Sequence, residues 1–361
     1  MKVVIEKCDS YEEVEKALEE GMKKLGGMET FIKKGEKVAI KPNLLQAKEP
    51  EHAVTTHPEV VRAVIKQVKK ITREISIAES PGIVGSIQGW ERLIETTGMK
   101  KIAEEEGVKI VMLKTPKKMQ NPNGTLAKEF SISEEILEYD KIINIAKLKT
   151  HSLTVYTGAV KNMFGIIPGK LKSGMHVKHP TPENFSRMLL DLYKLKKAEL
   201  NIIDGVEGME GQGPAAGEKK HFGILGISED GLALDYVITK GLKLEVPMIK
   251  IAEKRNMIKE IQVEGEINGN MESPRTSIVQ SMALPLAATI IKRVSSRPAL
   301  IKERCTKCAS CFKICSAEAI KMSPYPEFDY SKCIRCYCCH EVCPEKAIYL
   351  KKSLAQKILR R

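Results

Sequence analysis

The sequence predicts an α/β fold with a largely parallel sheet and flanking helices, followed by a small cysteine-rich α+β module. Strand-like and helix-like segments alternate through residues 1–270, which is the pattern of an α/β protein. Polar residues follow directly after several strand-like segments, as they do in open parallel sheets. Nine of the ten cysteines lie in the last sixth of the 361 residues, so a second module is expected there.

The expected strands are short apolar runs, and two of the helices between them have clear start signals. The first strand begins at the amino terminus, and the others are expected at 37–43, 74–80, 108–113, 141–149, 199–208 and 221–230. Thr56 to Glu59 is typical of a capping box, and apolar residues at helical spacing follow it. Thr181, followed by Pro182, is expected to open a second helix.

Polar side chains follow five of these strands at the point where each strand ends. The segments are 41–43, 79–82, 147–151, 204–207 and 229–231. A single segment of this kind is what an ordinary turn looks like, but ligands of open parallel sheets bind outside the carboxyl ends of the strands. Five such segments together therefore predict one binding site. The residues expected to bind a substrate are Lys41, Asn43, Glu79, Lys147, Lys149, Lys161, Asn162, Asp204 and Glu207.

Residues 147–179 hold the densest group of lysines and histidines. The lysines suit an anionic ligand such as a carboxylate or a phosphate. His151, His176 and His179 are expected to donate protons to that ligand near neutral pH. Two alternatives remain open. The hydrophilic stretch at 169–178 could be a solvated flap, and His176 with His179 could bind a divalent metal.

Eight cysteines form two copies of the pattern Cys-x2-Cys-x2-Cys-x3-Cys. This is the bacterial run for [4Fe–4S] clusters, in which the fourth cysteine of each run binds the other cluster. The module resembles a two-cluster bacterial ferredoxin. One cluster is expected on Cys305, Cys308, Cys311 and Cys343, and the other on Cys333, Cys336, Cys339 and Cys315. Cys338 is expected to pack beside a cluster without binding it. A disulfide framework and paired zinc sites fit these runs less well.

The composition limits the classes of function. Hydrophobic residues make up 42% of the chain, enough for a substantial core, and no apolar run reaches the length of a membrane span. The amino terminus enters a strand directly, so we expect a cytoplasmic protein without a cleavable leader. The net charge is +13, but lysines alternate with glutamates and aromatic residues make up only 5%. These features argue against nucleic acid as a partner.

Several motifs in series resemble the domain of unknown function 362 family, in a version with a fused ferredoxin module. They are Lys41-Pro42-Asn43, Thr56-His57-Pro58, Lys147-Leu148-Lys149-Thr150-His151, Lys161-Asn162 with Gly165, and Asp204-Gly205 through Pro214. The resemblance covers nearly the whole chain. It implies an iron–sulfur protein of bacteria and archaea, generally anaerobes, but it supplies no reaction. Ser316 departs from the pattern, because the first cysteine run normally ends with proline.

These observations divide the chain into an α/β domain (1–270), a linker with a short helix (271–297), a two-cluster module (298–350) and a basic tail (351–361). The leading hypothesis is a reductase that passes electrons through both clusters to a small anionic substrate or cofactor. A ferredoxin-like carrier that docks to a redox complex is the alternative, and a nucleic-acid binder is a weaker one. Residues 301–361 contain thirteen Lys and Arg against six Asp and Glu, which favours an acidic redox partner such as a soluble ferredoxin.

Overall fold

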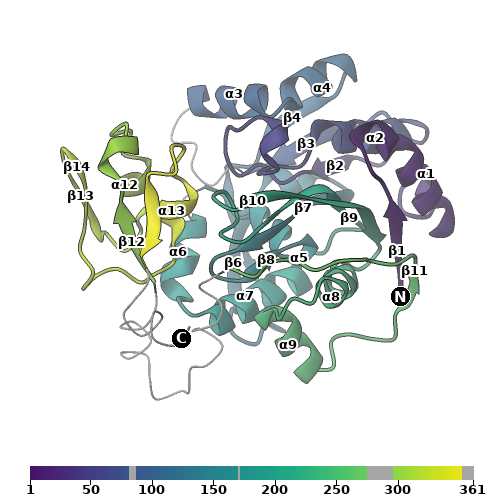
Figure 1. Ribbon diagram of the computed structural model, residues 1–361. Helices are drawn as coiled ribbons and strands as arrows, with labels where there is room; N and C mark the ends of the chain where they lie inside the picture. Colours follow the sequence, from purple (N-terminus) through teal and green to yellow (C-terminus); the bar gives the residue numbers. More distant parts are fainter. Residues whose placement is uncertain (81–86, 170, 275–295, 352–361) are drawn as a thin grey trace.

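The computed structural model describes residues 1–80, 87–169, 171–274 and 296–351 (Figure 1). Among these residues, nine strands form one sheet in the order β11-β1-β10-β9-β7-β2-β3-β4, and β8 pairs with β7. The strands of this sheet are β1 (Lys2–Lys7), β2 (Val38–Lys41), β3 (Ile75–Glu79), β4 (Lys109–Met112), β7 (Lys141–His151), β8 (Val155–Thr157), β9 (Leu200–Glu210), β10 (Glu218–Ser228) and β11 (Gln262–Glu264). A separate hairpin is formed by β5 (Pro116–Gln120) and β6 (Glu129–Ser133).

The sheet is mostly parallel, which confirms the expected fold class. The central strands β9, β7, β2, β3 and β4 are parallel to one another. In contrast, β10 is antiparallel to both β9 and β1. The segment 229–231 after β10 therefore lies at the opposite edge from the other polar segments, and its predicted place in the binding site is wrong. Asp230 instead caps a helix, since its Oδ1 accepts from the N–H groups of Leu232 and Ala233.

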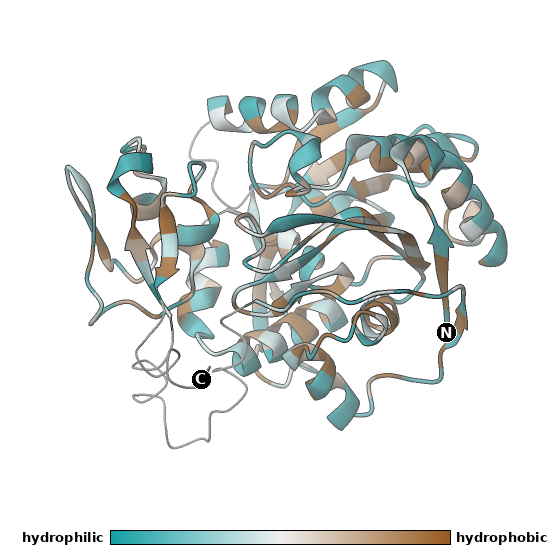
Figure 2. Ribbon diagram, viewed as in Figure 1, coloured by the Kyte–Doolittle hydropathy of each residue, from teal (hydrophilic) through white to brown (hydrophobic). Residues whose placement is uncertain are grey.

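Helices cover both faces of the sheet (Figure 1). The helices on one face are α1 (Val14–Lys24), α2 (Pro58–Lys69), α3 (Ile87–Thr96) and α4 (Met99–Glu105), and those on the other are α5 (Ala159–Asn162), α7 (Pro182–Leu195), α8 (Gly231–Gly241) and α9 (Pro247–Lys254). Ile142 and Ile143, neighbours on β7, pack into the two different cores because strand side chains alternate between faces. Figure 2 shows the hydrophobic residues on the strands and on the inner sides of the helices. No helix in the described ranges is long and apolar enough to cross a membrane.

The start of α2 differs from the predicted capping box. His57 is the N-cap residue, and its Nδ1 accepts from the N–H of Glu59 at 3.3 Å. Thr56 is buried, and its hydroxyl joins two other segments, because Oγ1 accepts from Asn43 N and donates to Ile145 O. The predicted cap of α7 is confirmed, since Thr181 Oγ1 accepts from Asn184 N at 3.1 Å.

The cysteine-rich module contains two short antiparallel strand pairs and two short α-helices. Its elements are β12 (Arg297–Leu300), α12 (Ser310–Ile314), β13 (Ile320–Ser323), β14 (Tyr325–Phe328), α13 (Cys338–Glu341) and β15 (Ile348–Lys351). Strand β12 pairs with β15, and β13 pairs with β14. The module lies beside α6 (Leu171–Lys178) at one end of the sheet (Figure 1). The short helix predicted near 278–293 and the tail from 352 fall outside the described residues.

Candidate functional site

Lys41 and Glu79 form a buried ion pair where β2 and β3 end. Lys41 Nζ lies 2.7 Å from Glu79 Oε2. The backbone of Gly165 packs directly on this pair, because a Cβ at that position would lie 2.4 Å from Lys41 Nζ. Burial lowers the pKa of Lys41, although the neighbouring Glu79 carboxylate acts in the opposite direction. The two opposite charges compensate each other, so this pair adds no net charge to the site.

A second buried ion pair joins β7 and β9 within their length, directly before the irregular register between Lys147 and Lys149. Lys147 Nζ lies 2.9 Å from Asp204 Oδ2 and donates to the Tyr11 hydroxyl at 2.8 Å. Asp204 also accepts from the N–H of His57, whose ring stacks on Tyr11 with 3.5 Å between ring centroids. Tyr11 and His57 line an open pocket of about 520 Å³. Neither residue was among the predicted site residues, although Tyr11 follows β1, whose carboxyl end lies at the same sheet edge.

Hydrogen bonds between side-chain amides connect Lys149 with α5 and with the interior of β7. Lys149 is buried and donates to Asn43 Oδ1 at 2.6 Å and to the backbone oxygen of Val54 at 2.5 Å. Asn43 Nδ2 donates to Asn162 Oδ1, and Asn162 Nδ2 donates to Asn144 Oδ1. Asn144 is a fully buried residue that sequence reasoning missed, because it lies within the apolar run of β7 rather than at its end. The structure thus brings four predicted strand ends together.

The cysteine-rich module contacts this edge of the sheet through α13. Glu341, the last residue of α13, is buried, and its Oε1 lies 3.4 Å from His151 Nε2. The backbone oxygen of Glu341 accepts from Gln46 Nε2, and Ser316 Oγ donates to Ser173 Oγ on α6 at 2.6 Å. Burial raises the pKa of Glu341 to about 7, while the nearby lysines Lys161 and Lys149 act in the opposite direction. Sequence reasoning missed Glu341, because only tertiary packing places it here.

His151 is held as one neutral tautomer. Its Nδ1 accepts from the N–H groups of Leu153 and Thr154 at 3.1 and 3.4 Å, so the ring proton is on Nε2. Burial, and then the positive charge of Lys161, lowers the pKa of His151 well below its usual value. His151 can therefore donate a hydrogen bond from Nε2 toward the module. The expected role of an acid near neutral pH does not fit this environment.

His176 and His179 do not fit the expected role of proton donors either. The His176 ring stacks on Phe185 at 4.3 Å and meets the edge of Phe164. Burial lowers the pKa of His176 to about 3 and also lowers that of His179, so both rings are uncharged at neutral pH. Across the described ranges, no three His, Cys, Asp or Glu side chains are grouped to hold a single metal ion. The metal alternative for these two histidines thus lacks a third ligand.

Three lysines at this edge have no carboxylate within ion-pairing distance in the described part of the chain. Lys149 and Lys172 donate only to neutral oxygens, and Lys172 contacts the backbone oxygen of Ser80. Lys161 faces the module, where Glu341 and Cys338 are its nearest acidic groups. Burial lowers the pKa of all three lysines, and that of Lys172 to about 7. We call Lys149, Lys161 and Lys172 the lysine site. Their excess positive charge would favour an anion.

The cysteines of the module are arranged as an internal repeat of 28 residues. Each cysteine from Cys305 to Cys315 has a counterpart 28 positions later, from Cys333 to Cys343. The backbone repeats as well, because three pairs of residues 28 positions apart share a left-handed conformation: Lys307 and Arg335, Ala309 and Tyr337, and Glu318 and Lys346. Cys315 Sγ and Cys343 Sγ each accept from a backbone N–H, of Ala319 and Ala347 respectively.

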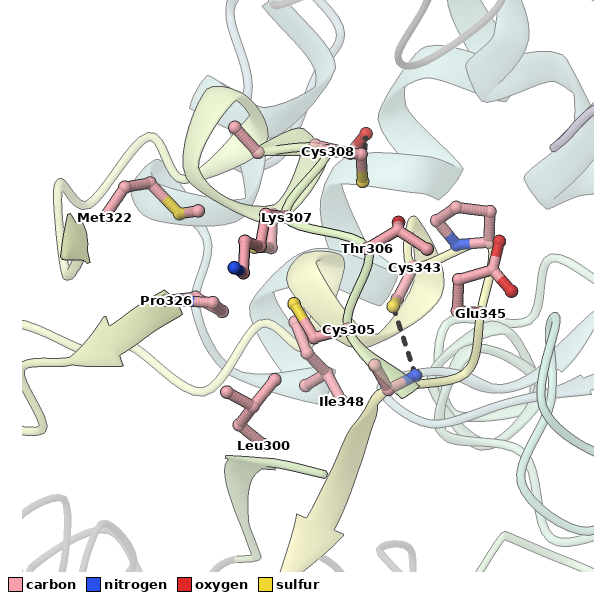
Figure 3. Close-up of a pocket in the computed structure, with 15 residues that line it drawn as sticks. Leu300, Cys305, Thr306, Lys307, Cys308, Met322, Pro326, Cys343, Glu345 and Ile348 are labelled. Carbon is pink, nitrogen blue, oxygen red and sulfur yellow. Dashed lines mark hydrogen bonds between the residues drawn. The ribbon is translucent and has the colours of Figure 1, made fainter. Parts of the chain in front are cut away.

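The four cysteines of the first predicted ligand set line one pocket, together with Thr306 and Lys307 (Figure 3). In the second set, burial and four neighbouring cysteines raise the pKa of Cys339 well above its usual value. Such thiols lose their protons readily only beside a cation, which iron would supply. A [4Fe–4S] cluster binds one thiolate at each of its four irons. Its four cysteines therefore need not lie as close together as the ligands of a single metal ion. Both sets therefore fit a cluster chemically.

Comparison with known proteins assigns both parts of the chain. Residues 38–240 match the model of the family described as domain of unknown function (DUF362). This match covers more than half of the chain and contains the ends of β2, β3, β7 and β9. The chain belongs to the DUF362 family. Residues 326–349 match a 4Fe-4S binding domain, so this DUF362 protein carries an iron–sulfur electron-transfer domain of ferredoxin type at its C-terminal end.

One curated relative and two solved structures are similar to this DUF362 protein. The thylakoid-associated protein sll1697 of Synechocystis sp. (strain ATCC 27184 / PCC 6803 / Kazusa) is 32% identical over 262 residues, which is 72% of this chain and 80% of that protein. The lactate racemase apoprotein from Thermoanaerobacterium thermosaccharolyticum has a TM-score of 0.36 at 13% identity, over 55% of this chain. A protein from Thermotoga maritima has a TM-score of 0.38 at 13% identity, over 69% of this chain. The chain spans 50% and 60% of the lengths of these two structures.

The site of this DUF362 protein extends beyond the matched region at both ends. Tyr11 precedes residue 38, and Glu341 belongs to the ferredoxin-type domain. Glu207, by contrast, turns away from the lysine site, since its carboxylate lies near His221 Nδ1 (3.2 Å) and Lys219 Nζ (3.9 Å) beside the open pocket. Pro81 and Gly82 of the predicted segment 79–82 fall outside the described residues.

Proposed function

We propose that this DUF362 protein is a cytoplasmic iron–sulfur reductase that holds two [4Fe–4S] clusters and reduces a small anionic substrate at the lysine site. The observation that carries the proposal is the position of α13. This helix contains Cys339, a predicted cluster ligand, and Glu341, which contacts His151 beside the lysine site. The helix that would help to hold a cluster through Cys339 is thus the same helix that contacts the lysine site through Glu341.

The 28-residue repeat supports two clusters rather than one. Both halves have the same cysteine spacing, the same left-handed positions and the same N–H to sulfur hydrogen bond. Two clusters supply one electron each, which suits a two-electron reduction. The proposed ligand sets remain Cys305, Cys308, Cys311 and Cys343 for the first cluster, and Cys333, Cys336, Cys339 and Cys315 for the second.

The exposure of the cysteines supports a direction of electron flow. Cys308 of the first set is exposed, whereas none of the four cysteines of the second set is exposed and Cys339 on α13 is buried. Electrons from a soluble partner such as a ferredoxin would enter at the first ligand set and leave from the second. The substrate would gain two electrons in total, both supplied by that partner.

The residues of the α/β domain would bind and orient the substrate. Lys149, Lys161 and Lys172 would hold its anionic group, because their charges have no carboxylate partner in the described ranges. His151 would donate a hydrogen bond from Nε2 to a substrate oxygen in place of Glu341 Oε1, which lies 3.4 Å away. Lys41 and Lys147 would position the strand ends through their ion pairs with Glu79 and Asp204.

The test begins with anaerobic purification and mass spectrometry of any small molecule that co-purifies. Lys172→Gln should reduce the amount of this molecule, and reoxidation of the reduced clusters by it, about tenfold or more. Lys178→Gln is the matched control, since Lys178 is an exposed residue on the same helix. Unchanged cluster reoxidation in Lys172→Gln, Lys161→Gln and His151→Ala would refute the reductase and favour the electron-carrier alternative.

A further inference from the structure

We propose that the seam between the α/β domain and the cluster module contains a second binding site, for a small hydroxylated organic anion. The site is a pocket of about 260 Å³. Gln212, in the segment after β9, lines it from the α/β side, and Arg304, His340 and Lys346 line it from the module. It is separate from the lysine site, because the next residue on α13, Glu341, contacts His151 instead.

His340 lines this pocket and has a buried ring nitrogen without a hydrogen-bond partner among the described residues. Its side chain is buried, with 6% of the residue exposed. Nδ1 lies 2.5 Å from the backbone oxygen of Ile348, and since a carbonyl oxygen only accepts, Nδ1 must carry the ring proton. In the neutral ring Nε2 is then an acceptor, and it has no hydrogen-bond partner among the described residues. A hydroxyl group of a ligand would satisfy this nitrogen.

Gln212 supplies a donor from the α/β side of the pocket. Its Nε2 is buried and likewise lacks a partner in the described ranges. The backbone on both sides of Gln212 is fixed, because Thr150 Oγ1 donates to Gly211 O, and Ser152 N and Oγ both donate to Gly213 O. The backbone that carries Gln212 is therefore held before a ligand arrives, and an oxygen of the ligand would accept from the side-chain amide.

The remaining lining residues define the class of ligand. Arg304 and Lys346 are cationic, and the pocket is lined by no Asp or Glu of the described chain. Apolar and aromatic residues and Ser296 complete the wall: Ala216, Ser296, Ile301, Ile348, Tyr349 and Leu350. An unpaired acceptor, an unpaired donor and two cations around a small apolar wall fit a short-chain anion with a hydroxyl group. Its anionic group is a carboxylate or a phosphate.

Isothermal titration calorimetry of the anaerobic, cluster-loaded full chain tests this site. The probes are L-malate, succinate, which lacks only the hydroxyl group, and glycerol 3-phosphate. Malate should bind about tenfold more tightly than succinate, because its hydroxyl supplies the bond to His340. Glycerol 3-phosphate binding more tightly than malate would identify the anion as a phosphate. The absence of measurable binding for all three probes would overturn the proposal, because water alone would then be the partner of His340 Nε2 and Gln212 Nε2.

Variants distinguish this pocket from general attraction to a basic surface. Gln212→Met keeps the size of the side chain but removes the donor, and it should weaken binding of the tightest probe about tenfold without changing the iron content. Lys346→Gln should weaken it as well. Lys313→Gln is the control, because Lys313 is an exposed cation on α12 that does not line the pocket. Unchanged binding in Gln212→Met, or an equal loss in Lys313→Gln and Lys346→Gln, would refute the site.

Discussion

At the scale of single residues, the lysine site depends on cations that the fold holds in a poorly hydrated place without a carboxylate beside them. Lys172 is the clearest case, since burial lowers its pKa from 10.5 to about 7 even though Glu79 acts in the opposite direction. A protein without bound anion loses stability at such a residue. Such a loss of stability is common at sites that bind a charged ligand, because the ligand supplies the opposite charge that the protein lacks.

The pKa of Lys172 predicts a rise in stability with pH. Between about pH 7 and pH 10, unfolded Lys172 keeps a proton that folded Lys172 has released, so the free energy of unfolding should increase with pH in this window. Lys172→Met should show a smaller increase than the wild type in urea unfolding of the anion-free protein. Lys178→Met should keep the wild-type slope. Equal slopes for Lys172→Met and the wild type would contradict the assigned environment.

Cys338 and Cys339 are adjacent, but only Cys339 should bind iron. Cys338 packs with Ile314, Val342 and the predicted ligand Cys336, whereas Cys339 belongs to the group with Cys311 and Ile320. Cys338→Ser should therefore retain about eight iron atoms per chain, and Cys339→Ser should fall toward four or fewer. Iron and acid-labile sulfide analysis of anaerobic protein measures this. The reverse outcome would show that the register of the second run is shifted by one residue.

At the scale of elements, short helices at the sheet edge carry the site, and each is held by a contact from elsewhere. Helix α5 has only four residues, yet it carries Lys161 and Asn162. Asp235 on α8 holds its start, because its carboxylate accepts from the N–H groups of Ala159 and Val160 and from the Tyr156 hydroxyl. A helix this short depends on such contacts, since one turn has little stability of its own.

Asp235→Ala should destabilise the protein more than the loss of an ordinary helix cap. It leaves two buried N–H groups and a tyrosine hydroxyl without their acceptor, so the free energy of unfolding should fall by about 3 kcal/mol. Asp230→Ala removes the cap of α8 and should cost only about 1 kcal/mol. Urea unfolding of both variants gives the comparison. Similar losses in the two variants would mean that α5 does not depend on Asp235.

At the scale of the whole molecule, the module presents different cysteines to solvent and to the α/β domain. Cys308 is exposed next to Lys307, while α13 is packed against the sheet edge. The chain has a net charge of +13. An acidic electron donor would therefore be attracted over a distance, and salt would weaken this attraction.

Reduction of the clusters by a reduced acidic ferredoxin should slow about tenfold between low and high salt, because screening removes the electrostatic steering. Stopped-flow absorbance of the clusters under anaerobic conditions measures the rate. Lys307→Gln, beside the exposed cysteine, should lower the rate at low salt, whereas Lys219→Gln on β10 should not. A rate independent of salt would exclude electrostatic docking of an acidic donor.

The sequence by itself determined the elements whose signals are local. Strand ranges such as 37–43 and 141–149 were predicted from apolar runs, and the observed β2 and β7 overlap them. The parallel direction of β9, β7, β2, β3 and β4 follows from strand and helix alternation, which is why Lys41, Glu79, Lys147 and Asp204 could be assigned to one edge in advance. The cysteine spacing likewise predicted the ferredoxin-type domain.

Only the tertiary structure decided the features that depend on pairing, burial and docking. The antiparallel direction of β10 removes segment 229–231 from the site, and no local signal distinguishes it from a parallel strand. Neutral His151 and His176 result from burial, which a sequence does not measure. Glu341 reaches the lysine site although it lies 300 positions after Lys41, because docking of the module places α13 there. Residue types and their spacing can be read from the sequence, whereas the environment of a charged group depends on how the whole chain folds.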